Sequence, residues 1–251
     1  MVGNGRTLGV FSGKGGVGKT TTAVNLAAAL SLDFKRNVAL VDTNISSSSL
    51  GFHLGMHYSP YNINHVLRGE ISVDKAVGIH HSGIKVLPAS IKLQDSFTKQ
   101  YLLPKVVSYM SKYSEFVLLD TAPSIGEETL WALRSVDEAV LVTTPDTPSV
   151  IEVIKLAKLA NNYNVKVLGI VVNKYNKAGV KPAEIANLCQ SKILGLIPED
   201  INVRKSIEKN TPVVHYRPYS KASLAFKEIS SKISGDRYKK SVSDKILSVF
   251  S

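Results

Sequence analysis

The stretch that decides the fold is "TLGVFSGKGGVGKTTT", which runs from Thr7 to Thr22. It opens with a short apolar run, residues 7–11, that is typical of a buried strand, and it leads into an alanine-rich segment, residues 20–31, that is typical of a helix. The loop between them carries the phosphate-binding pattern G-x-x-x-x-G-K-[ST], formed by Gly13, Gly18, Lys19 and Thr20. Because strand, loop and helix follow in the order that this pattern requires, we favour a phosphate-binding loop over an accidental glycine-rich turn.

The residue types of this loop suit a nucleoside triphosphate. Glycines let successive backbone N–H groups turn inward as a nest for anionic oxygens, and the following helix adds the positive end of its dipole. We expect Lys19 to reach the β- and γ-phosphates, Thr20 to bind Mg²⁺ and Thr21 to contact the α-phosphate. The other loop residues expected around the phosphates are Gly13, Gly15, Gly16, Val17 and Gly18.

Short apolar segments alternate with longer helical patterns along the rest of the chain. The apolar segments are rich in Val, Leu and Ile without clean alternation, which is typical of strands buried on both faces of a parallel sheet. The further strands are expected at 38–42, 84–88, 116–120, 138–144, 165–173 and 193–198. The further helices are expected at 99–112, 148–161, 181–190 and 221–233. We therefore predict an α/β fold with a single doubly wound, mostly parallel sheet flanked by helices.

Bulk composition limits the function classes. The chain has 251 residues and a formal net charge of +11, from 31 Lys+Arg against 20 Asp+Glu. This charge suits either a solvated basic surface or attraction to anionic membranes, nucleic acid or nucleotides. The apolar runs are too short to span a bilayer, and we expect no secretory signal. The single Cys189 cannot form an internal disulfide or, alone, a metal cluster, so we expect a reducing cytoplasm.

Two further strand ends carry acidic side chains. Asp120 ends the apolar run "FVLLD", and Asp42 ends "VALVD". Because the carboxyl ends of parallel strands meet at one edge of the sheet, we expect both acids beside the phosphate-binding loop. Asp120 is then the acid that holds a water on Mg²⁺, and Asp42 is a second candidate that acts through water. The alternative for Asp120 is an ordinary acid that caps a strand.

The segment "KGGVGKTT" resembles the deviant phosphate-binding loop of the MinD/ParA family of ATPases. Other blocks, such as "LRGEISVDKAV", "VLPAS" and "LGLIPEDINVRKSIEKNTPVV", follow in the order of that family, so the resemblance spans about residues 7–233. The MinD side of the family, with an archaeal character, fits better than the plasmid-partition side. The resemblance implies that ATP is the nucleotide, that the ATP-bound chain forms a homodimer, and that Lys14 reaches the nucleotide of the partner subunit.

The same resemblance assigns the contacts to the base and the segments that respond to the γ-phosphate. Asn173, at the end of "VLGIVVN", is expected to contact the adenine edge, for which an amide offers both a donor and an acceptor. The alternative is an asparagine that forms a turn. Pro198 and Asp200, from "IPED", are expected in the second loop around adenine, where the contacts can be to the backbone. The segment "TAPSIG" resembles switch II.

Asn44 departs from the family pattern at the residue on which hydrolysis depends. The family usually carries D-x-D in switch I, whereas this chain reads Asp42-Thr43-Asn44. An amide can align water through its carbonyl oxygen, but it cannot take a proton or supply negative charge. We therefore expect normal ATP binding with slow hydrolysis to ADP and phosphate. The alternative is an ATP-bound scaffold with impaired hydrolysis, in which Asn44 is either a natural choice or an engineered Asp-to-Asn exchange that traps the dimer.

The chain end differs from the rest, which gives two expected parts: an ATPase domain at 1–235 and a tail at 236–251. Written as a helix, the tail gathers apolar side chains towards one side and adds lysines, and it resembles the membrane-targeting helix of MinD. The resemblance implies a cytoplasmic protein that binds the inner face of the cell membrane when ATP-bound, recruits a regulatory protein and takes part in spatial positioning. The alternatives are a frayed or packed terminal helix and a ParA-like partition ATPase that binds DNA.

Overall fold

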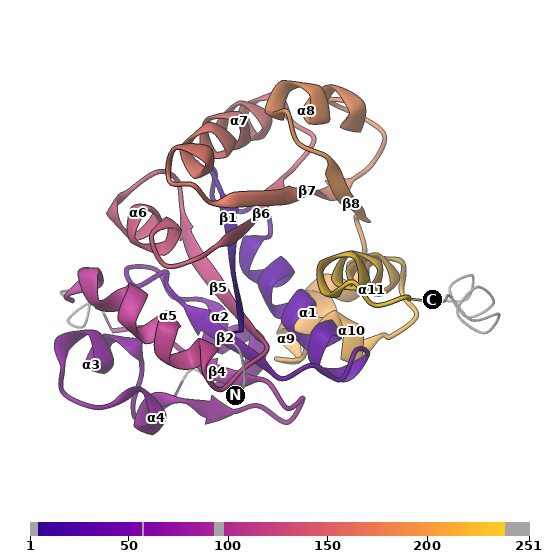
Figure 1. Cartoon of the computed structure of the whole chain (residues 1–251). Coiled ribbons are helices and arrows are strands. Elements are labelled where there is room, and N and C mark those ends of the chain that lie inside the picture. The colour runs from indigo at the N-terminus through magenta and orange to yellow at the C-terminus, as the bar shows by residue number, and fades with distance from the viewer. Residues whose placement is uncertain (1–4, 57, 93–97, 239–251) are drawn as a thin grey trace.

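The centre of the molecule is a mostly parallel β-sheet (Figure 1). The computed structural model describes residues 5–56, 58–92 and 98–238. Within them the strands are β1 (Arg6–Ser12), β2 (Val38–Asp42), β3 (Gly78–Ile79), β4 (Lys85–Leu87), β5 (Phe116–Pro123), β6 (Glu138–Thr143), β7 (Lys166–Tyr175) and β8 (Ile193–Pro198). They lie in the order β3-β4-β2-β5-β1-β6-β7-β8, and of the pairings described only β3 with β4 is antiparallel.

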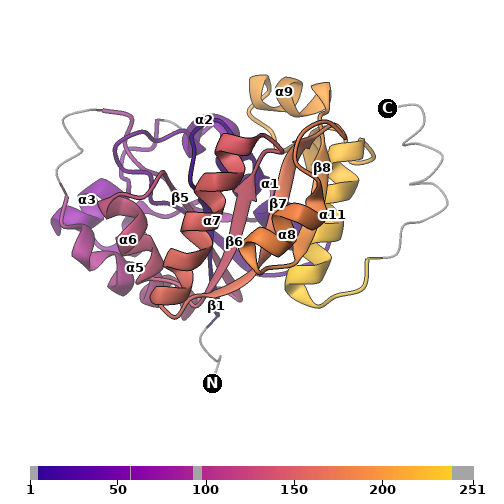
Figure 2. The ribbon, with the colours of Figure 1, turned by 90° about the horizontal axis from the view of Figure 1, so that it is seen from above.

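Helices cover both faces of the sheet. They are α1 (Lys19–Leu32), α2 (Leu50–Leu54), α3 (Ile63–Arg68), α4 (Val73–Ala76), the 3₁₀ turn η2 (Gln100–Leu102), α5 (Leu103–Ser111), α6 (Glu127–Leu133), α7 (Thr147–Asn162), α8 (Pro182–Cys189), α9 (Ile201–Glu208), α10 (Val213–Tyr216) and α11 (Lys221–Ser234). Figures 1 and 2 show α1 and α11 on one face and α5, α6, α7 and α8 on the other. None of the described helices is long and apolar enough to cross a membrane.

Burial on both faces explains why the strand segments lack polar alternation. In β2, Val38 and Leu40 pack into the core under α1 and α11, whereas Ala39 and Val41 pack into the core under α5 and α7. All four side chains are fully buried. The predicted α/β fold with a doubly wound, mostly parallel sheet is confirmed.

The register of the three central strands brings the polar strand ends together. Asp42 of β2 lies directly opposite Asp120 of β5, and Asp120 in turn lies opposite Val10 of β1. The loop that follows β1 therefore emerges beside both acids. This edge is the point where successive strands are added in opposite directions, which is where doubly wound sheets bind their ligands.

The differences from the predicted elements lie at the sheet edge, in short helices and at the end of the central strand β5. The two-residue strand β3 was not predicted, because Gly78 and Ile79 are too short a segment to carry a pattern. The predicted helix at 99–112 divides into η2 and α5, with a proline in the first turn of α5. The predicted strand at 116–120 continues to Pro123.

The chain leaves α11 along the loop between α1 and β2. Gly235 ends the helix with a left-handed φ of 81°. Arg36 then pairs with Asp236 at 2.6 Å, and the ring of Tyr238 packs edge-on against Phe34 with a centroid distance of 6.4 Å. The predicted tail lies outside the described residues from 239 onward, so the division at 235 stays a prediction.

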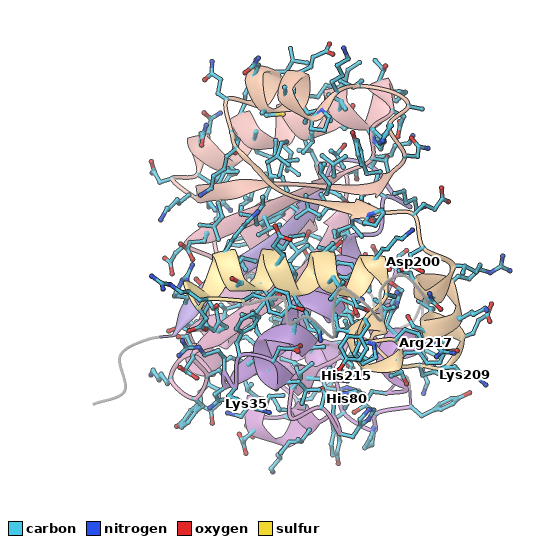
Figure 3. All side chains as sticks on the ribbon, turned by 90° about the vertical axis from the view of Figure 1, so that its right-hand side faces the viewer. Lys35, His80, Asp200, Lys209, His215 and Arg217 are labelled. Carbon is cyan, nitrogen blue, oxygen red and sulfur yellow. The ribbon has the colours of Figure 1, made fainter. Side chains whose placement is uncertain are left out.

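A cluster of three histidines joins the turn between β3 and β4 to α10; Figure 3 labels His80 and His215. The ring centroids lie 3.9 Å apart for His80 and His81, and 6.4 Å apart for His81 and His215. The Nε2 atoms of His80 and His215 are buried without a hydrogen-bond partner among the described residues. Burial, followed by the charge of His81, lowers the pKa of both to about 4. Toward His215, Asp33 acts to raise the pKa and Lys227 to lower it.

Acidification should destabilise the fold through His80 and His215. Between the folded pKa of about 4 and the ordinary value of 6.5, the unfolded chain binds protons that the folded chain does not. The stability that depends on their neutral forms is therefore complete above ~pH 7 and is lost as the pH falls towards 4. Because solvent screens partly buried rings, the loss should be about 1 kcal/mol per histidine between ~pH 7.5 and ~pH 5.

The variant His215→Gln should lose less unfolding free energy between the two pH values, because the contribution of His215 is absent. Urea unfolding at both pH values measures this difference. The buried acids of the sheet are unchanged in the variant, so their titration cancels in the comparison. An equal loss of unfolding free energy in both proteins would contradict the assignment.

Candidate nucleotide-binding site

The glycines of the loop after β1 are required by its shape. Gly16 and Gly18 have φ values of +79° and +90°, which disfavour any side chain. A Cβ on Gly18 would lie 2.1 Å from Nδ2 of Asn173, whereas Gly15 and Gly16 face open space. Gly13 packs against α7, where a Cβ would lie 2.5 Å from Cβ of Glu152. The loop is thus a cradle of backbone with free space in front of it.

That space is a cavity of about 610 Å³ at the carboxyl edge of the sheet. Its lining includes most of the residues predicted from the sequence, namely Lys14, Gly15, Gly16, Gly18, Lys19, Thr20, Thr21, Asn44, Asn173, Pro198 and Asp200. Val17 lines a neighbouring cavity of about 470 Å³ that shares Lys14, Gly15 and Gly16. Gly13, Asp42 and Asp120 lie outside the lining of both cavities.

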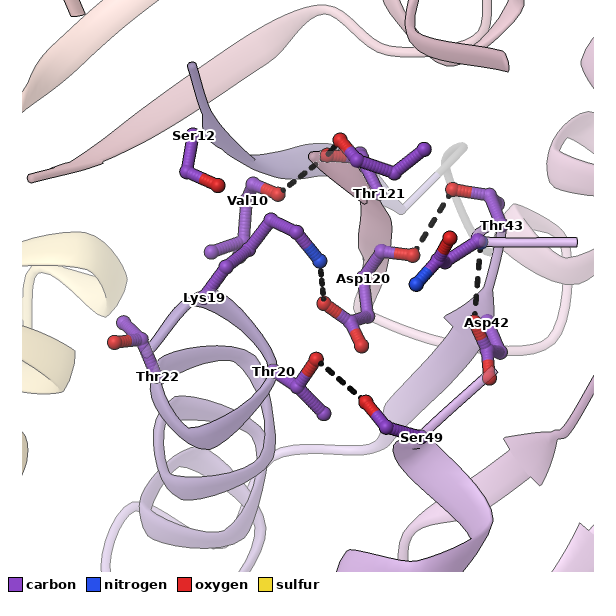
Figure 4. A network of polar contacts seen from close by, with 12 residues as sticks. Val10, Ser12, Lys19, Thr20, Thr22, Asp42, Thr43, Ser49, Asp120 and Thr121 are labelled. Carbon is purple, nitrogen blue, oxygen red and sulfur yellow. Dashed lines mark hydrogen bonds and ion pairs between the residues drawn. The ribbon is translucent and has the colours of Figure 1, made fainter. Parts of the chain in front are cut away.

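A buried ion pair lies at the base of the cradle (Figure 4). Nζ of Lys19 donates to Oδ1 of Asp120 at 2.7 Å, with the two side chains 7% and 0% exposed. Beside them the hydroxyl of Thr20 lies 3.2 Å from that of Ser49. Oδ2 of Asp120 is buried without a partner among the described residues. A carboxylate oxygen that has no partner among the described residues, next to the hydroxyl of Thr20, suits a hard cation with its water shell.

Asp42 is fully buried opposite Asp120, and its carboxylate accepts hydrogen bonds from the loop that follows β2. Its Oδ2 accepts from the hydroxyl of Ser48 at 2.7 Å, and its Oδ1 accepts from the backbone N–H of Asn44 at 3.1 Å. Burial and then the negative charge of Asp120 raise its pKa to about 7, although Lys19 acts in the opposite direction. Asp42 therefore shapes the loop directly, and its action on Mg²⁺ through water stays a prediction.

The side chain of Asn44 is held at one end and free at the other. Its Nδ2 donates to the carbonyl of Ser47 at 2.5 Å. Its Oδ1 is buried without a partner among the residues that the structure describes, and Asn44 is only 6% exposed. Since Asn44 lines the cavity, this oxygen is the kind of acceptor that a reacting water needs.

Lys14 lies at the rim of the cavity rather than at its base. Its Nζ lies 3.4 Å from Oδ1 of Asp146, and both side chains are about half exposed. Burial would raise the pKa of Asp146, but hydrogen bonds from Thr144 and Ser149 outweigh it and lower the pKa. The carboxylate of Asp146 also caps α7 through the backbone N–H of Ser149 at 3.1 Å.

The predicted base-binding residues have unequal positions. Asn173 is 7% exposed and donates its Nδ2 to the carbonyl of Val17 at 2.8 Å, which connects the end of β7 to the phosphate loop. Asp200 caps α9 through the N–H of Asn202 at 2.9 Å and accepts from the N–H of Ala222 at 3.1 Å. Both oxygens of Asp200 thus join elements of the fold, and this favours a backbone contact to a base at this loop.

Sequence reasoning missed three side chains at this site. His53 of α2 lines the cavity and lies 3.3 Å from the hydroxyl of Thr21. Lys174 donates to the carbonyl of Gly16 at 3.1 Å. Glu128 of α6 accepts from two backbone N–H groups of the loop that carries Asn44. None of them belongs to a spaced motif; only the position of Lys174 next to Asn173 was a local signal.

Fold and site together define a P-loop NTPase, because a glycine cradle, a buried lysine and an acid at a neighbouring strand end meet at the switch point of a parallel sheet. The ParA family model, described as NUBPL iron-transfer P-loop NTPase, matches residues 4–234. The chain belongs to the MinD/ParA family of P-loop ATPases. Nucleotide and Mg²⁺ are the ligands of such a site, and the cradle and the free oxygen of Asp120 fit both.

Two relatives show the range of the family. The chain is 32% identical over 236 residues to an uncharacterized ATP-binding protein of Methanocaldococcus jannaschii, covering 92% of this chain and 88% of the relative. It is 31% identical over 250 residues to an iron–sulfur cluster carrier protein of the same organism, covering 89% of this chain and 82% of that protein.

Two solved structures resemble the whole described domain. The cell division ATPase MinD of Pyrococcus furiosus matches with a TM-score of 0.88 at 29% identity, covering 92% of this chain and 99% of that one. The septum site-determining protein MinD of Pyrococcus horikoshii, in complex with Mg-ADP, matches with a TM-score of 0.87 at 26% identity, covering 91% and 95%.

Proposed function

We propose that this chain is an ATP-dependent dimerising switch that binds an anionic membrane surface in its ATP state and takes part in spatial positioning in the cell. The observation that carries the proposal is the position of Lys14. Its ammonium group lies at the rim of the cavity, about half exposed, and its described partner, Asp146, is 3.4 Å away and equally exposed. An exposed pair of this kind is worth little, so Lys14 is free to reach the phosphates of a second copy.

The phosphates and the metal would be held by the chain's own groups at the base of the cradle. Lys19 would exchange part of its contact with Asp120 for the β- and γ-phosphates, and Thr20 would turn its hydroxyl to the metal. Asp120 would hold a water of the Mg²⁺ shell through its free oxygen. Bound Mg²⁺ supplies the positive charge that two buried carboxylates and one lysine lack here.

Iron–sulfur transfer is the main alternative that the relatives raise. Clusters are held mainly by cysteine thiolates, and a cluster shared by two copies of one chain needs several of them. Cys189 is the single cysteine of the sequence. It is buried on α8, where burial raises the pKa of its thiol and disfavours the thiolate. This chain therefore lacks the ligands for that role, and the switch is the better proposal.

Ending the chain after Tyr238 should lower ATP-dependent sedimentation with anionic liposomes at least tenfold and leave ATP-dependent dimerisation unchanged. Two tails on one dimer bind a surface far better than one, because the second binding event becomes intramolecular. The measurement compares no nucleotide, ADP and ATP by light scattering and by liposome sedimentation. The cut keeps the contact between Phe34 and Tyr238 that anchors the end of the domain.

Phe250→Asp in the full chain is the matched comparison for the truncation, because it removes an apolar side chain of the tail and keeps the tail at its full length. A monomer in all three nucleotide conditions would contradict the switch. An ATP-dependent dimer that ignores lipid and retains salt-sensitive binding to duplex DNA would favour a DNA-binding partition ATPase, for which the net charge of +11 is suitable.

A further inference from the structure

The loop that carries Asn44 is held by a side chain from a distant element. Oε2 of Glu128 accepts from the backbone N–H of Ile45, and its Oε1 accepts from the N–H of Ser46, each at 3.1 Å. Glu128 lies in the first turn of α6, 83 and 82 positions away from these two residues. One carboxylate thus accepts hydrogen bonds from the two backbone N–H groups that directly follow Asn44.

Of the two hydrogen bonds to Glu128, the one from Ile45 is partly buried and the one from Ser46 is exposed. Glu128 is partly buried, and burial raises the pKa of its carboxyl group, while the bonds from Ser46 and Ile45 act to lower it. Hydrogen bonds to a charged acceptor are stronger than neutral ones, and the two bonds together fix both the position and the direction of the loop.

The hydrogen bonds of Glu128 also connect the two segments expected to respond to the γ-phosphate, namely the loop that carries Asn44 and the segment between β5 and α6. β5, which carries Asp120, leads into α6 through Ser124, which has a left-handed φ of +70°. The carbonyl of Ser124 accepts from the hydroxyl of Thr129 at 2.7 Å. Such a backbone is held in place by its surroundings, so the start of α6 has a defined position relative to Asp120.

The residues of the loop that precede Ile45 are also held, close to the buried acids of the sheet. The N–H of Thr43 donates to the carbonyl of Asp120 at 2.8 Å, and the N–H of Asn44 donates to Asp42. Residues 43 and 44 are therefore held from β5 and β2, and residues 45 and 46 from α6. Asn44, whose Oδ1 has no partner among the described residues, lies where these two sets of anchors meet.

We propose that Glu128 is a positioning residue for ATP hydrolysis: by holding the N–H groups of Ile45 and Ser46 it fixes the amide oxygen of Asn44 and ties the Asn44 loop to α6. The proposal rests on the proposed function, because it takes Asn44 as the residue that orients the attacking water. Glu128 acts through Asn44 and does not line the nucleotide cavity.

The test is a double-mutant cycle in the full chain with Mg-ATP. Glu128→Ala should lower the single-turnover rate of hydrolysis about tenfold and change the Kd for Mg-ATP less than threefold. In an Asn44→Ala background the same substitution should have little further effect, because the residue through which Glu128 acts is gone. Glu128→Gln, which keeps one acceptor oxygen, should have an intermediate rate.

Glu127→Ala is the matched control, because this neighbouring acid faces Nε1 of Trp131 at the surface, 3.4 Å away, and should leave the rate unchanged. If the chain with Asn44 turns over too slowly to follow, the Glu128 substitutions are measured in an Asn44→Asp chain. Equal rate effects of Glu128→Ala with and without Asn44 would overturn the proposal, as would an effect on Kd alone. Dimerisation by ATP, measured separately, decides the proposed switch independently of this result.

Discussion

Changing Lys19 to alanine should weaken Mg-ATP binding about thirtyfold and lower the rate of hydrolysis by a hundredfold or more. Hydrogen bonds to charged groups contribute about 1.5–3 kcal/mol, which corresponds to roughly ten- to hundredfold in affinity. Removing a preorganised group that stabilises transition-state charge typically costs a further factor of about 10²–10³ in rate. Lys19 meets both conditions, since its side chain is 7% exposed at the base of the cradle. Calorimetry with Mg-ATP and single-turnover hydrolysis would measure the two effects.

The same substitution should also destabilise the chain without nucleotide, because it leaves Asp120 and Asp42 as buried acids with no cation. Breaking a buried ion pair on one side typically costs about 3–5 kcal/mol. Asp120→Asn should cost less, because it removes one of the two carboxylates and so relieves the repulsion that adds to burial in raising the pKa of Asp42. Both variants should lose hydrolysis, but Lys19→Ala should unfold at the lower urea concentration.

Lys155→Ala is the control for charge alone, since Lys155 lies on α7 with a 58% exposed side chain paired to Glu152. It should change neither affinity nor rate by more than about threefold, because exposed pairs contribute about 1 kcal/mol or less. If Lys155→Ala weakened Mg-ATP binding as much as Lys19→Ala, the affinity would depend on net charge rather than on the cradle.

The sheet could be predicted from the sequence where strands are buried on both faces. Residues 38–42 form β2 with the predicted bounds, because each of the five side chains is buried and an unbroken apolar run precedes Asp42. Short elements were missed for the opposite reason. β3 has two residues and α10 has four, so neither is long enough to show a periodicity. Their positions depend on the packing of their neighbours.

The residues of the candidate site also fall into two groups: those that belong to contiguous motifs, and those whose contacts depend on the packing of distant elements. The sequence alone points to the phosphate loop and Lys19 because all their residues are contiguous, and to Asp120 because it ends the apolar run of a strand that continues to Pro123. Glu128 and His53 could not be predicted in this way, because their contacts depend on how α6 and α2 pack against the loops of other strands. Asp200 shows the converse: a residue placed near the base by its motif also serves as the cap of α9.

Replacing Asn44 with aspartate should raise the single-turnover rate of ATP hydrolysis about ten- to hundredfold. A positioned general base typically contributes about 10²–10⁴, and the loose transition state of phosphoryl transfer reduces what deprotonation adds. The structure supplies the position, because Oδ1 of Asn44 is buried, unpartnered among the described residues and on the wall of the cavity. A carboxylate there keeps that acceptor and adds the negative charge that an amide lacks.

The new acid should be accommodated only at a cost to stability. Asp42 and Asp120 already repel each other, and Nδ2 of Asn44 loses its bond to the carbonyl of Ser47 when it becomes an oxygen. Asn44→Asp should therefore unfold at a lower urea concentration without nucleotide, while its Kd for Mg-ATP stays within about threefold. Asn44→Ala, which removes the acceptor, should hydrolyse ATP more slowly than the chain with Asn44. A rate for Asn44→Asp no faster than that of the chain with Asn44 would show that Asn44 does not limit hydrolysis. The alternative of a scaffold with impaired turnover would then have no support.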